Sequence, residues 1–379
     1  MTDRKLPEAI VDCDVHNAPI SDEALRAYLP AEWRERRDTV GYLPAMFRQY
    51  RENLGDRSYM GAEYPRPTPR ASRVDAWPPS GHPPASDLDF TRAQLLDAWN
   101  VHYAVLNPLL GAAEQLNDEY GAALATAIND WQVAEWLDPE PRLRASICVP
   151  FEDAELAAAE VDRVAGDRRF VQVQLLSRTR EPLGRRRYWK LYEAAVRHDL
   201  PLGIHYGGWG GMPITGAGFP SYYIEDSGGM ATAFQAQVTS LVLEGVFERF
   251  PTLKVVLIEG GFGWLPPLMW RLDRAWRRLR AEVPHVSRPP SETIRSSFWF
   301  TTQPMEEPPR ERDFHELIDQ LDMDDRIMFS TDYPHWDFDS PARALPAGLG
   351  ADLRRRIMSE NAVALYGLQP VPHSEAAVG

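Results

Sequence analysis

Val11-Asp12-Cys13-Asp14-Val15-His16 is the first strand-like run of this chain, and apolar residues lead into it from the N-terminal side. Side chains alternate across a strand, so Asp12, Asp14 and His16 are predicted to share one face. Two carboxylates and an imidazole are costly to bury without a partner, and a divalent cation offsets that cost. The run therefore predicts a metal site. The alternative is a solvent-exposed strand end whose aspartates cap turns.

The composition is that of a soluble globular protein, with 379 residues, 44% hydrophobic and 25% charged. We find no apolar run near the ~20 residues that a membrane helix needs. The net charge of −14 argues against nucleic acid or an anionic membrane as a partner and leaves a small-molecule substrate. The start, Met1-Thr2-Asp3-Arg4-Lys5, lacks the apolar core of a signal peptide. The only cysteines, Cys13 and Cys148, lie in strand-like runs, so we expect a reducing, cytoplasmic location.

Strand-like and helix-like runs alternate along the rest of the chain. Further strands are predicted at 101–106, 143–149, 170–175, 202–205, 253–259, 297–301 and 326–332. Helices are predicted at about 114–137, 154–165, 188–197, 231–250, 265–282, 314–321 and 352–365. Eight strands alternating with helices predict an α/β protein with a (β/α)8 TIM-type barrel. The alternative is an open doubly wound sheet, although no glycine fingerprint for a dinucleotide opens any of these helices.

One long connection interrupts the alternation between residues 17 and 100. It holds two helical pieces, 22–28 and 43–53, and a stretch rich in proline, arginine and serine between 65 and 84. We interpret the chain as a single barrel domain, 1–379, in which 17–100 forms a lid or an oligomer arm on the active-site face. A homodimer is expected on this interpretation. A flexible surface loop is the alternative for 66–86.

Polar side chains stand where four of the predicted strands end. The first strand ends in Asp14 and His16, and the fifth, sixth and eighth end in His205, Glu259 and Asp332. In a barrel, catalytic side chains come from the carboxyl ends of the strands. Histidines and carboxylates from four strand ends therefore predict a metal site at that face.

Several stretches resemble the amidohydrolase superfamily, in the amidohydrolase-related branch that includes aminocarboxymuconate-semialdehyde decarboxylase. The resemblance covers about residues 8–367, most of the chain. The stretches that carry it are Val11-Asp12-Cys13-Asp14-Val15-His16, Gly203-Ile204-His205-Tyr206, Phe250-Pro251-Thr252-Leu253-Lys254, Glu259-Gly260-Gly261-Phe262-Gly263-Trp264-Leu265-Pro266 and Phe329-Ser330-Thr331-Asp332-Tyr333-Pro334-His335. The family's fold is similar to the (β/α)8 barrel predicted above.

The resemblance implies that Asp14, His16, His205 and Asp332 ligate one divalent metal ion, either zinc or manganese. Asp12 matches an aspartate that lies behind the ligands in many members. Two departures matter. The fourth strand has no lysine to bridge a second metal, so one ion is expected, and Glu259 replaces a histidine at the sixth strand.

The first functional expectation is a hydrolase that uses metal-activated water on a small cyclic amide, lactone or related bond. Asp332 would accept the proton of the water, and either Glu259 or His335 would protonate the leaving group. The alternative is a metal-dependent, non-oxidative decarboxylase of an aromatic or dienoic acid. A non-catalytic binding barrel is a third reading, which the retained ligand types argue against.

Three further residues are candidates for substrate binding. Arg178, after the fourth strand, is predicted to pair with a carboxylate, and its alternative is a solvated loop arginine. Trp209 and Trp336 follow the fifth and eighth strands and are predicted to wall the pocket.

Overall fold

The computed structural model describes residues 9–40, 72–208, 216–218 and 222–371. Its centre is one eight-stranded sheet in the sequential order β1 to β8, and all seven neighbouring pairs are parallel. The strands are β1 Ile10–Val15, β2 Val101–Leu106, β3 Leu143–Cys148, β4 Phe170–Arg178, β5 Leu202–Gly208, β6 Val255–Ile258, β7 Phe298–Thr301 and β8 Ile327–Met328. The predicted (β/α)8 barrel is therefore confirmed.

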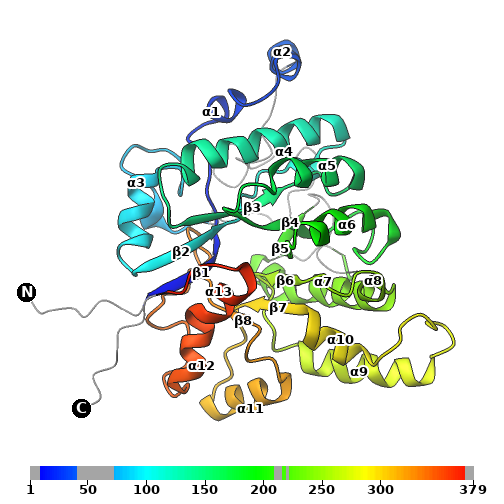
Figure 1. Cartoon of the computed structure of the whole chain (residues 1–379). Helices are drawn as coiled ribbons and strands as arrows, with labels where there is room; N and C mark the ends of the chain where they lie inside the picture. The colour runs from blue at the N-terminus through cyan, green and yellow to red at the C-terminus, as the bar shows by residue number, and fades with distance from the viewer. Residues whose placement is uncertain (1–8, 41–71, 209–215, 219–221, 372–379) are drawn as a thin grey trace, which may run out of the picture.

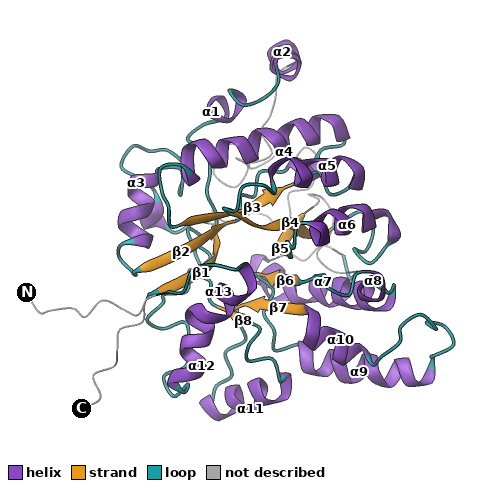
Figure 2. Ribbon diagram, viewed as in Figure 1, coloured by secondary structure: helices purple, strands orange, loops and turns teal. Residues whose placement is uncertain are grey.

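Helices surround the strands, as Figures 1 and 2 show. The α-helices are α1 Asp22–Arg26, α2 Ala31–Val40, α3 Leu88–Thr91, α4 Asp118–Gln132, α5 Ala154–Val164, α6 Trp189–Arg197, α7 Tyr223–Leu243, α8 Val246–Arg249, α9 Leu265–Arg278, α10 Pro290–Ser297, α11 Glu311–Leu321, α12 Ala351–Arg355 and α13 Asn361–Tyr366. Single π-helical turns, η3 Arg92–Leu96, η5 Val133–Leu137 and η7 Arg356–Glu360, continue α3, α4 and α12. Short 3-10 turns are η2 Val74–Ala76, η4 Ala112–Glu114 and η6 Arg186–Tyr188. None of the helices in the described ranges is long and apolar enough to cross a membrane.

The barrel closes where the short β8 meets β1, and we call this junction the seam. Here the Cys13 N–H donates to the Phe329 carbonyl at 3.0 Å, and the His16 N–H donates to the Tyr333 carbonyl at 2.8 Å. A β-bridge also joins Val15 to Tyr333. The first and last strands, β1 and β8, are thus joined by individual hydrogen bonds rather than by a long ladder.

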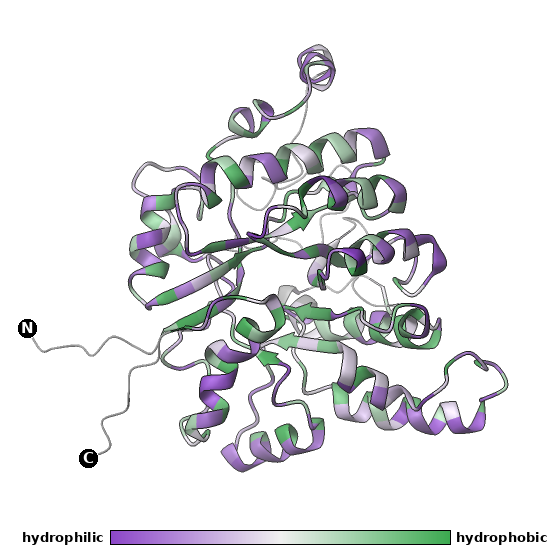
Figure 3. Cartoon of the chain, viewed as in Figure 1, coloured by the Kyte–Doolittle hydropathy of each residue, from purple (hydrophilic) through white to green (hydrophobic). Residues whose placement is uncertain are grey.

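The alternation of side chains along β6 divides the core into two layers. Val255 and Leu257 join the large cluster that packs against the helices. Val256 and Ile258 join a smaller cluster with Cys13, which we place inside the barrel because inward and outward residues alternate along barrel strands. In Figure 3 the strands are mainly hydrophobic and the helices carry their hydrophilic residues outward.

Two predicted elements differ from the observed ones for identifiable reasons. The eighth strand, predicted over 326–332, ends at Met328 because side chains replace the ladder beyond it. There the Ser330 N–H donates to Thr302 Oγ1, and the Thr331 N–H donates to Asp12 Oδ1. The helix predicted over 231–250 is instead split into α7 and α8 by Gly245, whose φ of 79° interrupts the helical backbone.

Part of the long connection between β1 and β2 contacts the turn after β8. Ser72 forms a β-bridge with His335, and the Arg73 N–H donates to the Pro334 carbonyl at 2.9 Å. The helical piece predicted at 43–53 lies outside the described residues, while the first piece is observed as α1. The role of 17–100 as a lid or oligomer arm stays a prediction.

Candidate metal centre

Five buried side chains converge at the carboxyl ends of the strands. Asp14 lies in β1, with His16 just after it, and His205 lies in β5; Glu259 and Asp332 follow β6 and β8. Each offers one ligand atom, and these five atoms all lie within 4.8 Å of one another. The structure therefore brings together the four ligands that the resemblance implies and adds Glu259 to them.

The spacing of these atoms suits one ion. His16 Nε2 lies 2.7 Å from Asp332 Oδ1 and 3.5 Å from Asp14 Oδ1. His205 Nε2 lies 3.5 Å from Asp14 Oδ2 and 3.0 Å from Glu259 Oε2. Two ligand atoms that are each about 2.1 Å from the same tetrahedral metal lie about 3.4 Å apart. The two separations of 3.5 Å match that value, and the shorter ones, 2.7 and 3.0 Å, would have to widen for the group to hold a divalent ion.

Unpaired buried atoms give an independent test of that fit. Asp14 Oδ2, His205 Nε2 and Asp332 Oδ2 are buried and lack a hydrogen-bond partner among the described residues. Such atoms are rare in folded proteins because each loses its hydration without replacement. A cation between them would satisfy all three at once. The donor set of nitrogen and carboxylate oxygen suits zinc or manganese.

The two histidine ligands have their outer nitrogens held by carbonyl groups. His16 Nδ1 lies 2.7 Å from the Asn107 carbonyl, and His205 Nδ1 contacts the Tyr206 carbonyl. A carbonyl oxygen only accepts hydrogen bonds, so both Nδ1 atoms carry a proton. In each ring this leaves Nε2 as the atom that can ligate a metal.

The charges in the site favour a cation at its centre. Burial on its own lowers the pKa of His16, but the carboxylates of Asp14 and Asp332 outweigh it and raise the pKa to about 9. Burial raises the pKa of Asp332, yet His335 and His16 together hold it well below its usual range. Binding of a divalent ion would displace the Nε2 proton of His16 and compensate the same carboxylates.

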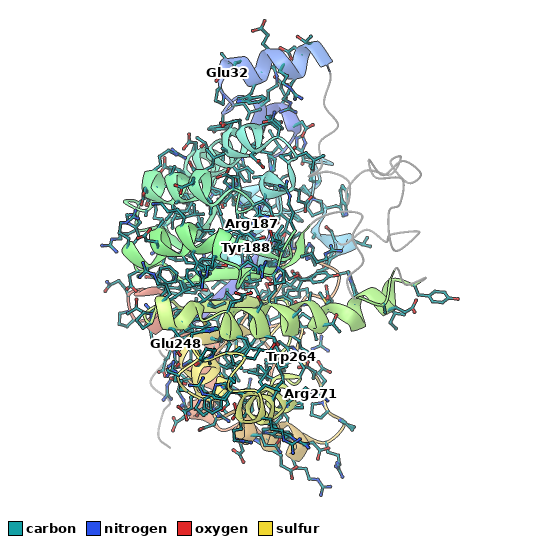
Figure 4. The ribbon with its side chains drawn as sticks, turned by 90° about the vertical axis from the view of Figure 1, so that its right-hand side faces the viewer. Glu32, Arg187, Tyr188, Glu248, Trp264 and Arg271 are labelled. Atoms are coloured by element: carbon teal, nitrogen blue, oxygen red, sulfur yellow. The ribbon has the colours of Figure 1, made fainter. Side chains whose placement is uncertain are left out.

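Two members of the cluster have an unusual backbone conformation. Glu259 and Asp332 have φ angles of 60° and 59°, in the left-handed region, which aspartate enters more readily than glutamate does. Neighbouring hydrogen bonds hold the conformation at Glu259. The Glu259 N–H donates to Thr301 Oγ1 at 3.2 Å, and the Trp264 indole, labelled in Figure 4, donates to the Gly260 carbonyl at 2.8 Å. Conformations of this kind collect at functional sites, where the surroundings enforce them.

His335 lies directly behind two of the ligands. Its ring stacks on His16 with centroids 4.4 Å apart, and its Nδ1 donates to Asp332 Oδ1 at 2.8 Å. Its Nε2 is buried and lacks a hydrogen-bond partner within the described ranges. Of the two predicted proton donors, His335 therefore stands beside the cluster, whereas Glu259 belongs to it.

Of the three candidates for substrate binding, the structure describes two. The guanidinium of Arg178, at the end of β4, lies 5.6 Å from the centre of the Tyr206 ring. Trp336 is about half exposed, beside His335 in the chain. Trp209 lies outside the described residues. Contact of these three residues with a substrate stays a prediction.

The prediction that Asp12 shares one face of the strand with Asp14 and His16 is corrected by the structure. The pairing of β1 with β2 shifts register between Asp12 and Val15, so strict alternation is broken there. Asp12 instead accepts hydrogen bonds from the N–H and hydroxyl of Thr331, at 2.9 and 2.6 Å. Asp12 thus supports the residue before Asp332 and lies outside the ligand set.

Asn107 is a site residue that the sequence analysis missed. It follows β2 directly, and its side-chain Nδ2 donates to Asp14 Oδ1 at 2.8 Å. Its position could have revealed it, because Asn107 is a polar residue at the carboxyl end of β2 and the other site residues also stand at strand ends.

Comparisons with known proteins agree with this site. A family model described as Amidohydrolase matches residues 11–368. Gamma-resorcylate decarboxylase of Polaromonas sp. strain JS666 is 27% identical over 269 residues, which cover 68% of this chain and 80% of the relative.

Two solved structures illustrate the shared fold. A dihydroxybenzoic acid decarboxylase from Polaromonas sp. JS666, with bound manganese and the inhibitor 2-nitroresorcinol, aligns with a TM-score of 0.64 and 21% identity over 95% of this chain and 97% of that one. An amidohydrolase from Mycobacterium avium subsp. paratuberculosis K-10 aligns with a TM-score of 0.68 and 21% identity over 96% and 100%.

Proposed function

The chain belongs to the amidohydrolase family of enzymes, and we propose that within it this protein is a metal-dependent decarboxylase that removes CO2 without oxidation from a hydroxylated aromatic carboxylic acid. The relative named above supports this substrate class, because it is a gamma-resorcylate decarboxylase. Decarboxylation is therefore the preferred function and hydrolysis the alternative, whereas the sequence alone favoured hydrolysis.

The observation that carries the proposal is the five-residue cluster with the His335 imidazole beside it, whose Nε2 has no hydrogen-bond partner among the described residues. Asp14, His16, His205 and Asp332 would hold the ion, with Glu259 next to His205. The bound manganese of the Polaromonas structure supports manganese as that ion. A bound divalent ion supplies positive charge that stabilises negative charge on substrate oxygens.

The protein's own task in this reaction is to deliver a proton. When the bond between ring carbon and carboxylate breaks, CO2 leaves and the electron pair stays on the ring carbon, which must then be protonated. His335 is the proposed acid. Its Nδ1 is held by Asp332, whose negative charge stabilises the imidazolium, and its buried Nε2 is the nitrogen that would give up the proton.

The test is a direct assay of the purified protein loaded with Mn²⁺. We expect 2,6-dihydroxybenzoate to lose CO2, measured as gas and as the disappearance of the substrate's ultraviolet absorbance. The same preparation treated with a chelator is the control and should be inactive. Release of no CO2 from 2,6-dihydroxybenzoate or a panel of other hydroxybenzoates would contradict the proposal.

Hydrolysis of a cyclic amide or lactone is the second candidate. Glu259 favours it, because the sixth-strand position carries a carboxylate where the resemblance leads one to expect a histidine. The same preparation tested on lactones and cyclic amides distinguishes the two reactions: ring opening without CO2 would identify the hydrolase.

A further inference from the structure

Asn107 contacts four consecutive residues at the end of β1. Its side-chain Nδ2 donates to the Cys13 carbonyl at 3.2 Å and to Asp14 Oδ1 at 2.8 Å. Its backbone N–H donates to the Val15 carbonyl at 2.8 Å. Its backbone carbonyl accepts from His16 Nδ1 at 2.7 Å. One residue outside the ligand set therefore touches both ligands that β1 provides.

We infer that Asn107 is the positioning residue of the metal centre, and this inference rests on the metal centre of the proposed function. Its amide occupies Oδ1 of Asp14, which leaves Oδ2, 3.5 Å from His205 Nε2, as the oxygen available to the ion. Its carbonyl fixes the proton of His16 on Nδ1. Partners of this kind set ligand orientation and basicity, and their removal commonly weakens metal binding 10–100-fold.

The orientation of the Asn107 side-chain amide is itself fixed by hydrogen bonds to its oxygen. Its Oδ1 accepts from the Ser146 hydroxyl and from Gln172 Nε2, the latter at 3.1 Å. Gln172 Oε1 in turn accepts from the Tyr366 hydroxyl at 2.9 Å. A flipped Asn107 amide would place its NH2 group against two donors, the Ser146 hydroxyl and Gln172 Nε2. Each link therefore donates in the direction of Asp14, and such chains strengthen the final bond.

Asn107 also bonds to the irregular part of β1. The register of β1 against β2 shifts between Asp12 and Val15, so the regular ladder is interrupted there. Asn107 supplies hydrogen bonds to the Cys13 and Val15 carbonyls across this interval. Because a bulge re-aims the side chains next to it, the residue that stabilises the bulge also decides where Asp14 and His16 point.

The experiment measures Mn²⁺ binding to the full chain without any substrate. Free Mn²⁺ has a strong electron paramagnetic resonance signal, so a titration gives the dissociation constant directly. Asn107→Leu keeps the approximate size of the side chain and removes its hydrogen bonds. We expect it to bind Mn²⁺ about 10–100-fold more weakly than the unmodified protein.

Gln132→Leu is the matched control. Gln132 is also a fully buried amide, and its Nε2 donates to the Ser146 carbonyl at 3.1 Å without reaching Asp14 or His16. We expect this variant to lose stability but to keep its affinity for Mn²⁺. A purely structural role of Asn107 would make the two variants behave alike.

Asn107→Ala is the second variant and avoids a larger apolar side chain if the leucine variant does not fold. It removes both the donor to Asp14 and the acceptor for Gln172, so it too should bind Mn²⁺ at least 10-fold more weakly. Affinity within twofold of the unmodified protein in either variant overturns the inference. An unmodified protein that binds no Mn²⁺ overturns the metal centre as well, whereas one that binds Mn²⁺ and releases no CO2 overturns only the proposed reaction.

Discussion

Asp332 accepts hydrogen bonds from two imidazoles through one oxygen. His16 Nε2 and His335 Nδ1 lie 2.7 and 2.8 Å from its Oδ1, and Oδ2 has no hydrogen-bond partner in the part of the chain that is described. We therefore propose two chemically different functions for this carboxylate. One oxygen holds the proposed acid, and the other remains for the ion.

Asp332→Asn separates these functions. An amide oxygen can still ligate a metal, but a neutral amide cannot balance the charge of His335 as a carboxylate does. We expect turnover to fall by about 10²–10⁴-fold while part of the bound metal is retained. Steady-state kinetics and metal analysis of the same sample check this. A variant with near-normal turnover would show that the charge of Asp332 is not used.

His335 and Glu259 can be told apart by conservative variants. His335→Asn removes the proposed acid and should lower turnover by about 10²-fold or more with unchanged metal content. Glu259→Gln alters a member of the ligand cluster, so it should lower the affinity for the ion and recover activity at high metal concentration. The opposite pattern, a metal-independent loss in Glu259→Gln alone, would transfer the role of acid to Glu259.

Most residues of the candidate metal centre could be predicted from the sequence. Asp14, His16, His205 and Asp332 could be predicted because each ends a recognisable strand-like run. The same strand-end pattern pointed to Glu259, but the ligand set implied by the resemblance left it out, and its left-handed backbone conformation is not visible in the residue pattern. The displacement of Asp12 has a similar cause, since a register shift is set by the partner strand.

Among the elements, the segment before β3 is held by a buried carboxylate. Glu140 accepts from Arg142 Nε at 2.9 Å and from Arg92 Nε at 2.8 Å, and so it ties η3 to the start of β3. Hydrogen bonds from Arg142 and Arg92 overcome the effect of burial and lower the pKa of Glu140 from 4.5 to about 2.

Glu140→Gln is therefore expected to reduce stability in a pH-dependent way. A carboxyl whose pKa is lower in the folded state stabilises the fold above its unfolded value of 4.5, and this contribution disappears as the pH falls from 4.5 to about 2. We expect a loss of about 2 kcal/mol at pH 7 that shrinks as the pH falls below 4.5 and approaches zero near pH 2. Urea unfolding at several pH values measures it.

The matched control lies in an exposed ion pair. Glu193 is about half exposed, and its Oε2 lies 3.7 Å from Lys190 Nζ, so Glu193→Gln should change stability little. A Glu140→Gln variant that loses as much stability at pH 3 as at pH 7 would contradict the assigned cause.

The elements themselves were predictable where the period of the pattern was clear. β2 matches its predicted range, 101–106, because the buried residues 103–106 follow one another without a polar interruption, as in a strand covered on both faces. β8 was predicted too long because the residues after Met328 look like a strand but bond to side chains such as Thr302 Oγ1. Tertiary contacts of that kind have no local signature.

For the molecule as a whole, binding of an ion at the candidate metal centre is expected to affect stability. Asp14 Oδ2, His205 Nε2 and Asp332 Oδ2 have no hydrogen-bond partner among the residues that the structure describes, so an ion that binds only the folded state should stabilise the entire barrel. We expect Mn²⁺ at a hundredfold excess over its dissociation constant to add about 2.7 kcal/mol and to raise the melting temperature by a few degrees.

Calorimetry with and without a chelator checks this expectation. His205→Ala removes one ligand and serves as the control, since its melting temperature should no longer respond to Mn²⁺. An unmodified protein whose melting temperature is the same in chelator and in Mn²⁺ would contradict a metal site coupled to the fold.

The seam between β1 and β8 also governs when the site comes into existence during synthesis. His16 and Asp332 are 316 positions apart in the chain and 2.7 Å apart in space. A growing chain presents Asp14 and His16 long before Asp332 has been translated, so it cannot capture the ion while it is still being made. Contacts of such long sequence separation form late, because the intervening loop must first be ordered. Metal uptake would then mark the last step of assembly, and a chain released before its eighth strand would be left without the ion.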